Sequence, residues 1–345
     1  MTERYAALAL QLTAQSVETC ADRAAAAVQM QAQIATLGRQ LRGIKVFVEQ
    51  YSGLAVRLVV LPEYWLTSYP GRIGIAEFAT LAALAPDGPE YAALGRIAQD
   101  AGVHLAVNAY ETDAHFPGLY FQASVILSPA GDVVLRYRRL NSMYAPTPHD
   151  VWSKYLDIYG LDGVFPVAAT AIGKLAAIAS EEILYPEIAR AHALRGAEVF
   201  VHSSSEIGSP NPTAKHIARR ARALENLAWV VSANTAGIAG TGLPLASADG
   251  NSAIISPRGA VLAEANAGET FTAFAEIDLA ASRAQRRLPG MTNLLARQRL
   301  ELFAAAYAGQ VQPADGLGDG QVPDRDYFQR THEAVIKRLD EAGLI

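Results

Sequence analysis

A polar cluster follows an apolar run near the middle of the chain. The triplet Ser-Glu-Glu at 180–182 comes directly after Leu175–Ala179, a run with the length of a buried strand. Pro186 favours a helix start soon afterwards, because the N–H that proline lacks would be unpaired in the first turn. In an α/β protein, polar side chains where a strand ends are a common place for a functional site. The pattern therefore predicts a functional site at Ser180–Glu182, in which Ser180 carries a hydroxyl.

A serine hydroxyl is a weak acid, so Ser180 would need a well-aligned base in order to attack a substrate. Serine hydrolases usually use histidine for this purpose, and the chain offers His149 and His202. His202 follows the next predicted strand and should lie at the same end of the sheet, although such a histidine is more often a structural residue. The alternative is that Glu63 activates Ser180 directly.

Two further charged residues follow strand-like runs. Glu63 comes just after Val56–Leu61, and Pro62 fixes its backbone. A lone glutamate at such a place is more often a surface loop charge, whereas burial raises the pKa of a carboxylate and suits it to proton transfer near neutral pH. Arg139 ends a run with three arginines in four residues, which is also typical of a basic strand end at the surface. A guanidinium there could stabilise an oxyanion or bind a substrate carboxylate through two hydrogen bonds.

These stretches resemble the motifs of a known family, the carbon–nitrogen hydrolase (nitrilase) superfamily. The sequence VVLPEYWLTSYPG around Glu63 is similar to its first motif, whose glutamate is the general base. Leu135–Leu140 resembles its Tyr-Arg-Lys motif, and Arg139 falls on the catalytic lysine. Tyr-Pro-Glu at 185–187 fits the motif after the nucleophile, and the acidic pair before it resembles that of the aliphatic-amidase branch. The family has cysteine where this chain has Ser180.

The two changed positions alter what the resemblance implies. Arginine keeps the positive charge of lysine but is larger, planar and effectively never deprotonated. A shift of one residue in the alignment would place Arg138 on the motif instead, and Lys154 could supply an amine from further along the chain. The family often has a further glutamate between its lysine and its cysteine, and His149 or Asp150 could take that place here.

Other matches bear on the fold more than on the chemistry. Arg219–Asn226 resembles the family's Arg-Ala-x-Glu-Asn helix, and Asn234 with Gly237 resembles its Asn-x-x-Gly strand end. Asp249–Ser252 and Ser256–Gly259 are similar to its Gly-x-Ser…Pro-x-Gly hairpin. Each match alone has an ordinary interpretation as helix charges or a turn. Their common order along the chain indicates that the chain has the family's fold.

Strands alternate with helices, and hairpin-like pairs between them favour two mixed sheets with helices outside in an α/β protein. The resemblance implies the αββα sandwich of the carbon–nitrogen hydrolases over residues 5–280, followed by a C-terminal helical extension over 281–345. We expect a long helix over Cys20–Tyr51 that Ser16 caps, and an irregular loop over 138–165. The expected strands are Tyr5–Leu12, Val56–Leu61, Val103–Tyr110, Tyr120–Leu127, Val133–Tyr137, Leu175–Ala179, Val199–Val201, Trp229–Asn234, Ser252–Ser256 and Phe271–Ile277.

Composition excludes several classes of protein. The chain has 345 residues, 51% of them hydrophobic, and a net charge of −5 without a block of like charges, so neither nucleic acid nor an anionic membrane is an expected partner. Its single cysteine, Cys20, excludes an internal disulfide. No apolar run approaches the roughly 20 residues that span a bilayer, and the first residues resemble a strand rather than a signal peptide. We therefore expect a cytoplasmic protein.

No metal or organic cofactor is expected, because the chain has no Cys/His cluster, no Walker motif and no dinucleotide-binding glycine pattern. The resemblance implies a small amide, nitrile or related carbon–nitrogen substrate, and a homodimer or larger homo-oligomer. The candidate catalytic residues are Glu63, Arg139 and Ser180. The candidate substrate-binding residues are Tyr69, His149, Glu182, Tyr185 and His202.

Three alternatives to hydrolysis by the native chain stay open. The pocket could carry out non-hydrolytic chemistry with Glu63 as acid and base. The protein could be catalytically silent and only bind a ligand. Ser180 could also have been introduced in place of a cysteine, to trap the substrate of an active hydrolase, although Arg139 would then be an unnecessary second change.

Overall fold

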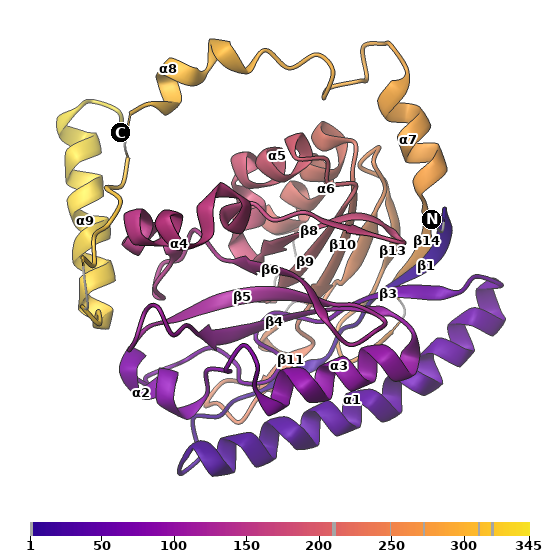
Figure 1. Ribbon diagram of the computed structural model, residues 1–345, viewed down its shortest axis with the longest axis horizontal. Coiled ribbons are helices and arrows are strands. Elements are labelled where there is room, and N and C mark those ends of the chain that lie inside the picture. Colours follow the sequence, from indigo (N-terminus) through magenta and orange to yellow (C-terminus); the bar gives the residue numbers. More distant parts are fainter. Residues whose placement is uncertain (1–2, 209–211, 249, 272, 310, 319–320) are drawn as a thin grey trace.

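The computed structural model describes residues 3–208, 212–248, 250–271, 273–309, 311–318 and 321–345. Two six-stranded sheets lie face to face, and helices cover their outer faces (Figure 1). The αββα sandwich that the resemblance implies is therefore confirmed. Asp249, the first residue of the expected hairpin, lies outside the described residues.

The first sheet has the strand order β14-β1-β3-β4-β5-β6. Its strands are β1 (Arg4–Ala9), β3 (Val56–Val60), β4 (His104–Thr112), β5 (Tyr120–Leu127), β6 (Val133–Arg138) and β14 (Phe274–Asp278). β1, β3 and β4 run parallel. The helices that return the chain between them are α1 (Arg23–Ser52), α2 (Ile75–Leu81) and α3 (Pro89–Ala101). β4, β5 and β6 are antiparallel neighbours joined by short loops.

The second sheet has the strand order β13-β12-β10-β9-β8-β7. Its strands are β7 (Ala168–Thr170), β8 (Gly173–Ala179), β9 (Val199–Ser204), β10 (Trp229–Asn234), β12 (Ala253–Ile255) and β13 (Val261–Glu264). β8, β9 and β10 run parallel, with α5 (Pro186–Leu194) and α6 (Ala214–Asn226) as the crossover helices. Two further strands, β2 (Thr13–Gln15) and β11 (Gly237–Ala239), pair with each other outside both sheets.

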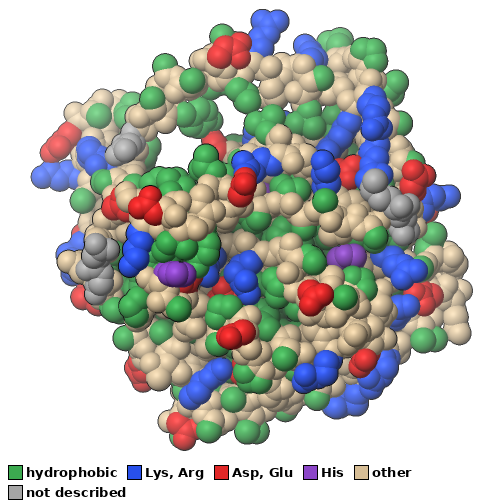
Figure 2. Space-filling view, viewed as in Figure 1, with side chains coloured by type: hydrophobic (Ala, Val, Ile, Leu, Met, Phe, Trp, Pro, Cys, Tyr) green, Lys and Arg blue, Asp and Glu red, His purple; other side chains and the backbone are tan. Residues whose placement is uncertain are grey.

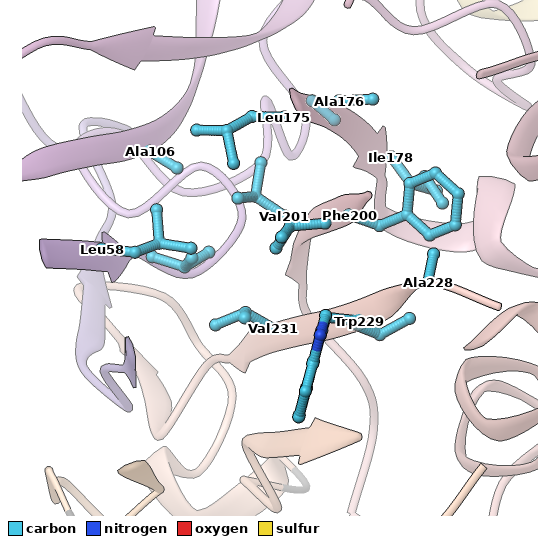
Figure 3. Close-up of a cluster of buried hydrophobic side chains, with 14 of the residues drawn as sticks. Leu58, Ala106, Leu175, Ala176, Ile178, Phe200, Val201, Ala228, Trp229 and Val231 are labelled. Atoms are coloured by element: carbon cyan, nitrogen blue, oxygen red, sulfur yellow. The ribbon is translucent and has the colours of Figure 1, made fainter. Parts of the chain in front are cut away.

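The space between the sheets is filled by apolar side chains. Along β3, Leu58 and Val60 belong to the cluster between the sheets, whereas Val59 belongs to the cluster under α1 and α3. This alternation is the period of two expected for a strand buried on both faces. Figure 3 shows Leu58 of the first sheet near Val201 and Val231 of the second. The two layers of the sandwich are thus held together by direct packing of strand side chains.

The long helix α1 begins later than the sequence suggested. Its N-cap is Asp22, whose carboxylate accepts a hydrogen bond from the Ala25 N–H at 2.8 Å. Ser16 does not cap the helix, because its hydroxyl accepts from the Glu18 N–H in the preceding turn at 3.1 Å. The expected cap was therefore wrong, and the helix starts at the acidic residue that stands next to its first free N–H groups.

The segment over 138–165 is also more regular than predicted. It contains the short helix η1 (Pro148–Val151) and the helix α4 (Trp152–Val164). The prolines suggested a loop, but Pro148 occupies a first-turn position, where its missing N–H costs nothing. Thr147 and Asp150 bond to each other's backbone as a capping box. The local pattern of a helix start therefore prevailed over the general tendency of proline to break helices.

After the last strand the chain runs through α7 (Leu279–Arg287), η4 (Leu300–Leu302) and α8 (Ala304–Tyr307) to α9 (Arg325–Glu341). Figure 1 shows this segment arching over the sandwich from α7 to α9, and Figure 2 shows an opening between the arch and the body. Tyr307 touches the body by donating a hydrogen bond to Glu187 on α5 at 2.8 Å. α9 is anchored through the buried side chain of Phe328.

On the face drawn in Figure 2, lysine and arginine side chains alternate with acidic ones, and neither charge forms a continuous patch. Within the ranges described above, every helix is too short or too polar to cross a lipid bilayer.

Candidate active site

A cavity of about 570 Å³ lies where β3 and β6 end and the turn after β8 begins. Its charged lining residues are Glu63, Arg72, Arg139, Glu181, Asp324 and Arg325. Tyr64 and Tyr69 from the loop after β3 line it as well. The ends of β3 and β9 meet here across the sandwich, since the Ser203 hydroxyl donates to the Leu61 carbonyl at 2.8 Å.

Glu63 is held in place by an amide network. Its side chain is buried, and its Oε1 accepts a hydrogen bond from Gln122 Nε2 at 2.8 Å. The same Nε2 donates to Asn108 Oδ1 at 2.9 Å, and this oxygen also accepts from the Tyr64 N–H at 3.1 Å. Tyr64 has a positive φ of 38°, which bends the chain sharply after Glu63. The carboxylate therefore has one fixed orientation at the cavity.

Arg139 connects the two acidic residues of the cavity. Its Nη1 donates to Gln122 Oε1 at 2.7 Å and lies 3.5 Å from Glu63 Oε1, while its Nη2 pairs with Glu181. Its Nε donates to the Asn141 carbonyl at 2.6 Å. Burial lowers the pKa of Arg139, but the neighbouring carboxylates more than offset this, so its pKa is raised. Arg139 is thus a fixed, permanent cation.

Arg138 points elsewhere. It forms ion pairs with Glu111, at 3.3 Å, and with Asp113. Successive side chains on a strand face opposite sides, so Arg138 and Arg139 cannot both reach the cavity. The structure places Arg139 at the cavity.

Ser180 starts the turn η2 (Ser180–Leu184) directly after β8. Its φ is 52°, in the left-handed region that a residue with a side chain adopts only under constraint. It is 5% exposed, and its hydroxyl lies 3.5 Å from Lys215 Nζ, which reaches it from α6. Its neighbour Glu181 lines the cavity, but Ser180 is not itself part of the cavity wall.

His202 contacts Ser180 through the backbone and not through the hydroxyl. Its Nε2 is 2.8 Å from the Ser180 carbonyl oxygen, and its Nδ1 is 2.8 Å from Ser232 Oγ. Burial lowers the pKa of His202 to about 3, so the ring is neutral. A neutral ring donates from one nitrogen only, and the carbonyl can only accept, so Nε2 carries the proton. This histidine fixes the strained turn rather than serving as the base for Ser180.

Glu182, like His202, is held by buried hydrogen bonds. It is fully buried, and its Oε2 accepts from the Tyr137 hydroxyl at 2.7 Å. Its Oε1 accepts from the backbone N–H groups of Leu140 and Asn141 at 2.7 and 3.0 Å. Burial raises the pKa of Glu182 to about 7, against the opposing effects of Arg139 and these donors. Glu182 therefore ties the turn after β8 to the backbone that carries Arg139.

Comparison with known proteins identifies the family of the chain. The family model described as carbon-nitrogen hydrolase matches residues 24–287. The chain belongs to the carbon–nitrogen hydrolase family. It is 27% identical over 280 residues to a nitrilase of Pyrococcus abyssi, covering 80% of this chain and 97% of that protein. It is also 25% identical over 233 residues to omega-amidase NIT2-A of Xenopus laevis, covering 67% and 80% of the two chains.

Solved structures share the fold of this carbon–nitrogen hydrolase family member. A carbon-nitrogen hydrolase of Helicobacter pylori superposes with a TM-score of 0.65 at 22% identity, covering 88% of this chain and 98% of the other. Nit3 of Saccharomyces cerevisiae, a nitrilase superfamily member, gives a TM-score of 0.62 at 18% identity, covering 85% and 96%. At these identities the likeness concerns the fold alone.

The other candidate residues lie apart from the cavity of this family member. His149 packs near Trp152, with ring centroids 6.1 Å apart, and its carbonyl accepts from the Asp315 N–H. Asp150 is engaged in the capping box with Thr147. The Lys154 ammonium lies 5.3 Å from the centroid of the Phe116 ring. None of these candidates lines the cavity, and the assignment of His149 or Asp150 to the place of the family's further glutamate stays a prediction.

Tyr69 lines the cavity, whereas Tyr185 is 44% exposed at the start of α5 and lies outside the cavity lining. In the part of the chain that the structure describes, no three His, Cys, Asp or Glu side chains are grouped to hold a metal ion.

Sequence reasoning missed Lys215. It lies in the first turn of α6, and its Nζ donates to the Ser205 carbonyl at 2.9 Å and lies 3.4 Å from Ser204 Oγ. The helix itself was predicted, but nothing in the local pattern marks a lysine at its start. A usable signal was that a first turn following a parallel strand lies at the same sheet edge as the residues after neighbouring strands.

Proposed function

We propose that this carbon–nitrogen hydrolase family member hydrolyses a small amide, nitrile or related carbon–nitrogen compound. Ser180 is the nucleophile, Glu63 is a general base and Arg139 stabilises negative charge. The observation that carries the proposal is the pairing of Glu63 with Arg139 at one cavity, next to a serine in a strained turn after β8. Strained residues cluster at functional sites because the surrounding structure must hold them in place.

The assigned roles follow from the chemistry of each group. Attack of the Ser180 oxygen on a carbonyl or nitrile carbon places negative charge on the substrate oxygen or nitrogen. The guanidinium of Arg139 is a permanent cation at the cavity and favours that charge. Glu63 is suited to accept a proton from the water that cleaves the acyl-enzyme. Gln122 is hydrogen-bonded to both Glu63 and Arg139 and thereby keeps the base and the cation next to each other.

The substrate class is supported by the cavity and by the relatives. A volume of about 570 Å³ with carboxylates, guanidinium groups and tyrosines suits a small polar molecule. The relatives named above are a nitrilase and an omega-amidase. Both names describe reactions at a carbon–nitrogen bond, so amides and nitriles are the compounds to test first.

The test combines steady-state turnover on a panel of amides and nitriles with intact mass measured during turnover. The parent should turn over at least one compound and gain the mass of one acyl group, and Ser180→Ala should lose both properties. The variant Ser180→Cys tests the same position with the family's own nucleophile. Turnover by Ser180→Cys alone would instead indicate a silenced or trapped hydrolase.

A second candidate is non-hydrolytic chemistry in the same cavity. The observation that favours it is that Glu63 and Arg139 line the cavity whereas Ser180 does not. Glu63 would then act as acid and base on a bound substrate without a covalent intermediate. In this case Glu63→Gln should abolish product formation while Ser180→Ala retains it, and no mass adduct should appear.

We also propose that residues 5–280 form the catalytic unit, that 281–345 form an extension of it, and that the protein is a homodimer or larger homo-oligomer by analogy with its family. Light scattering coupled to size-exclusion chromatography measures the assembly directly. A monomer at micromolar concentration would contradict the proposed homo-oligomer.

A further inference from the structure

Lys215 brings an amine to the nucleophile from an unexpected element. It is the second residue of α6, which follows the N-cap Thr213. Its side chain is 12% exposed, so most of it is packed inside the protein. Its Nζ lies 3.5 Å from Ser180 Oγ and 3.4 Å from Ser204 Oγ. The amine therefore stands within reach of the hydroxyl that the proposed reaction must deprotonate.

The orientation of this amine is fixed. Nζ donates to the Ser205 carbonyl at 2.9 Å and lies 3.7 Å from Glu206 Oε2. These two acceptors follow β9, whereas Ser180 follows the neighbouring strand β8. The lysine thus spans the ends of two parallel strands. Glu206 is the charged partner of this amine on one side.

The other bases near the turn are already engaged. His202 uses both ring nitrogens, on the Ser180 carbonyl and on Ser232. Glu63 lines the cavity, where it accepts from Gln122 and faces Arg139, whereas Ser180 does not line that cavity. A guanidinium is effectively never deprotonated. A lysine amine can accept a proton when it is neutral and return it when it is charged, and buried lysines serve as bases in this way.

We infer that Lys215 is the proton acceptor and donor for the Ser180 hydroxyl, so that the two residues form a serine–lysine catalytic pair. The inference rests on the proposed role of Ser180 as nucleophile. It also explains how the chain can lack the family's lysine at position 139: the amine comes from α6 instead of from the end of β6, and Arg139 retains only the positive charge.

Hydrolysis of an amide then has two stages, acylation of Ser180 and hydrolysis of the resulting ester. Neutral Lys215 Nζ takes the Ser180 hydroxyl proton while Oγ forms a bond to the carbonyl carbon. The resulting ammonium gives that proton to the leaving nitrogen as the C–N bond breaks, and ammonia or an amine departs. Water then attacks the ester carbon while Glu63 takes one water proton. The ester C–O bond to Ser180 Oγ breaks, and the proton held by Glu63 passes to Oγ through Lys215 as the carboxylic acid leaves.

The test uses a reaction that needs an activated serine but no substrate turnover. Methanesulfonyl fluoride transfers its sulfonyl group to Oγ, fluoride leaves, and the serine proton must go to a base. The rate of sulfonylation at Ser180 is followed by peptide mass spectrometry in the parent, Lys215→Met, Lys215→Arg and Lys174→Met. Lys174 is an exposed residue at the other end of β8 and serves as the matched control.

We expect Lys215→Met and Lys215→Arg to lower the rate by at least about 100-fold, the lower range of general-base effects, while Lys174→Met reacts like the parent. Arginine keeps the charge and the hydrogen bonds but not the proton transfer, so it separates a base from a cation. Parent-like rates in Lys215→Met or in Lys215→Arg, or an unreactive Ser180 in the parent, would overturn the inference. Thermal unfolding identifies any variant that has lost its fold.

A second reporter covers the case in which Lys215→Met unfolds. In Ser180→Cys, with Cys20 replaced by alanine, the pH dependence of iodoacetamide alkylation gives the thiol pKa. If the Lys215 amine lies next to the thiol, it affects the pH at which the thiol ionises. Lys215→Arg on the same background should therefore shift the thiol pKa. Identical profiles would overturn the pairing. Absence of turnover on amides and nitriles, combined with rapid Lys215-dependent sulfonylation, would instead disprove the proposed substrate class and leave the pair intact.

Discussion

Arg139 and Glu63 approach to 3.5 Å at the cavity, and Gln122 is bonded to both of them. The guanidinium therefore contacts the candidate base on one side and Glu181, next to Ser180, on the other. Arginine makes these contacts through separate nitrogens of a planar guanidinium, whereas a lysine would have to make all of them from one nitrogen. The substitution at 139 is thus accommodated by a network built around the arginine.

Glu63→Gln should remove the base and leave the network largely in place, because glutamine still accepts a hydrogen bond. We expect the turnover rate to fall by about 10²- to 10⁴-fold, the usual contribution of general acid–base catalysis. Steady-state kinetics on the most active compound of the panel gives the value. Glu77→Gln, on the exposed face of α2, is the control and should behave like the parent. A Glu63→Gln variant of full activity would rule out the assigned role.

Arg139→Ala should destabilise the fold as well as impair activity. It leaves the buried carboxylate of Glu63 without its cation, and removing one partner of a buried ion pair typically costs about 3–5 kcal/mol. Arg139→Lys keeps the charge and should cost less. Urea unfolding at neutral pH measures the free energies, and Arg96→Ala on the exposed side of α3 should change them by less than about 0.5 kcal/mol. Equal stability of parent and Arg139→Ala would contradict the ion-pair network.

Glu182 should make stability fall as the pH rises. Its pKa is about 7 in the folded protein, above the ordinary value of about 4.3 for an unfolded chain. The folded state therefore holds its proton more tightly, and this contribution is present below pH 4.3 and is lost as the pH rises through 7. Unfolding free energies at several pH values should show a decline across this window in the parent that Glu182→Gln lacks. Parallel curves for the parent and Glu182→Gln would disprove this contribution of Glu182 to stability.

His202 should produce the opposite slope. Burial lowers its pKa to about 3, whereas an unfolded histidine titrates near 6.5. Its contribution to stability is therefore complete above pH 6.5 and is lost as the pH falls toward 3. Acid unfolding of His202→Asn should show a weaker dependence in this range than that of the parent. His332→Asn, exposed on α9, should reproduce the parent curve; if it does not, the effect is not specific to His202.

The placement of Glu63, Arg139 and Ser180 was accessible to sequence reasoning because each follows an apolar run that has to be a buried strand. Once strands are recognised, their ends define an edge of the sheet, and motif similarity then fixes the register. The same reasoning could not assign His202 or Glu182, because whether a side chain faces a backbone carbonyl, a second side chain or a cavity depends on contacts between segments far apart in the chain.

Lys215 and α4 show two further limits. Lys215 follows strand β9 in sequence, but its target Ser180 follows β8, and only the packing of α6 brings the two together. α4 was hidden by prolines whose positions at a helix start are visible only when the capping partner is also recognised. In both cases the structure depends on a specific contact between side chains, which composition and periodicity do not reveal.

Asp324 and Arg325 complete the wall of a cavity whose candidate base is Glu63. Glu63 is synthesised long before Asp324 and Arg325. The strands of both sheets are therefore complete in the growing chain before the last lining residues of the cavity are added. A chain that ends before residue 324 would therefore lack two of the charged residues that line this cavity. The order of synthesis thus delays the complete site until nearly all of this sequence has been translated.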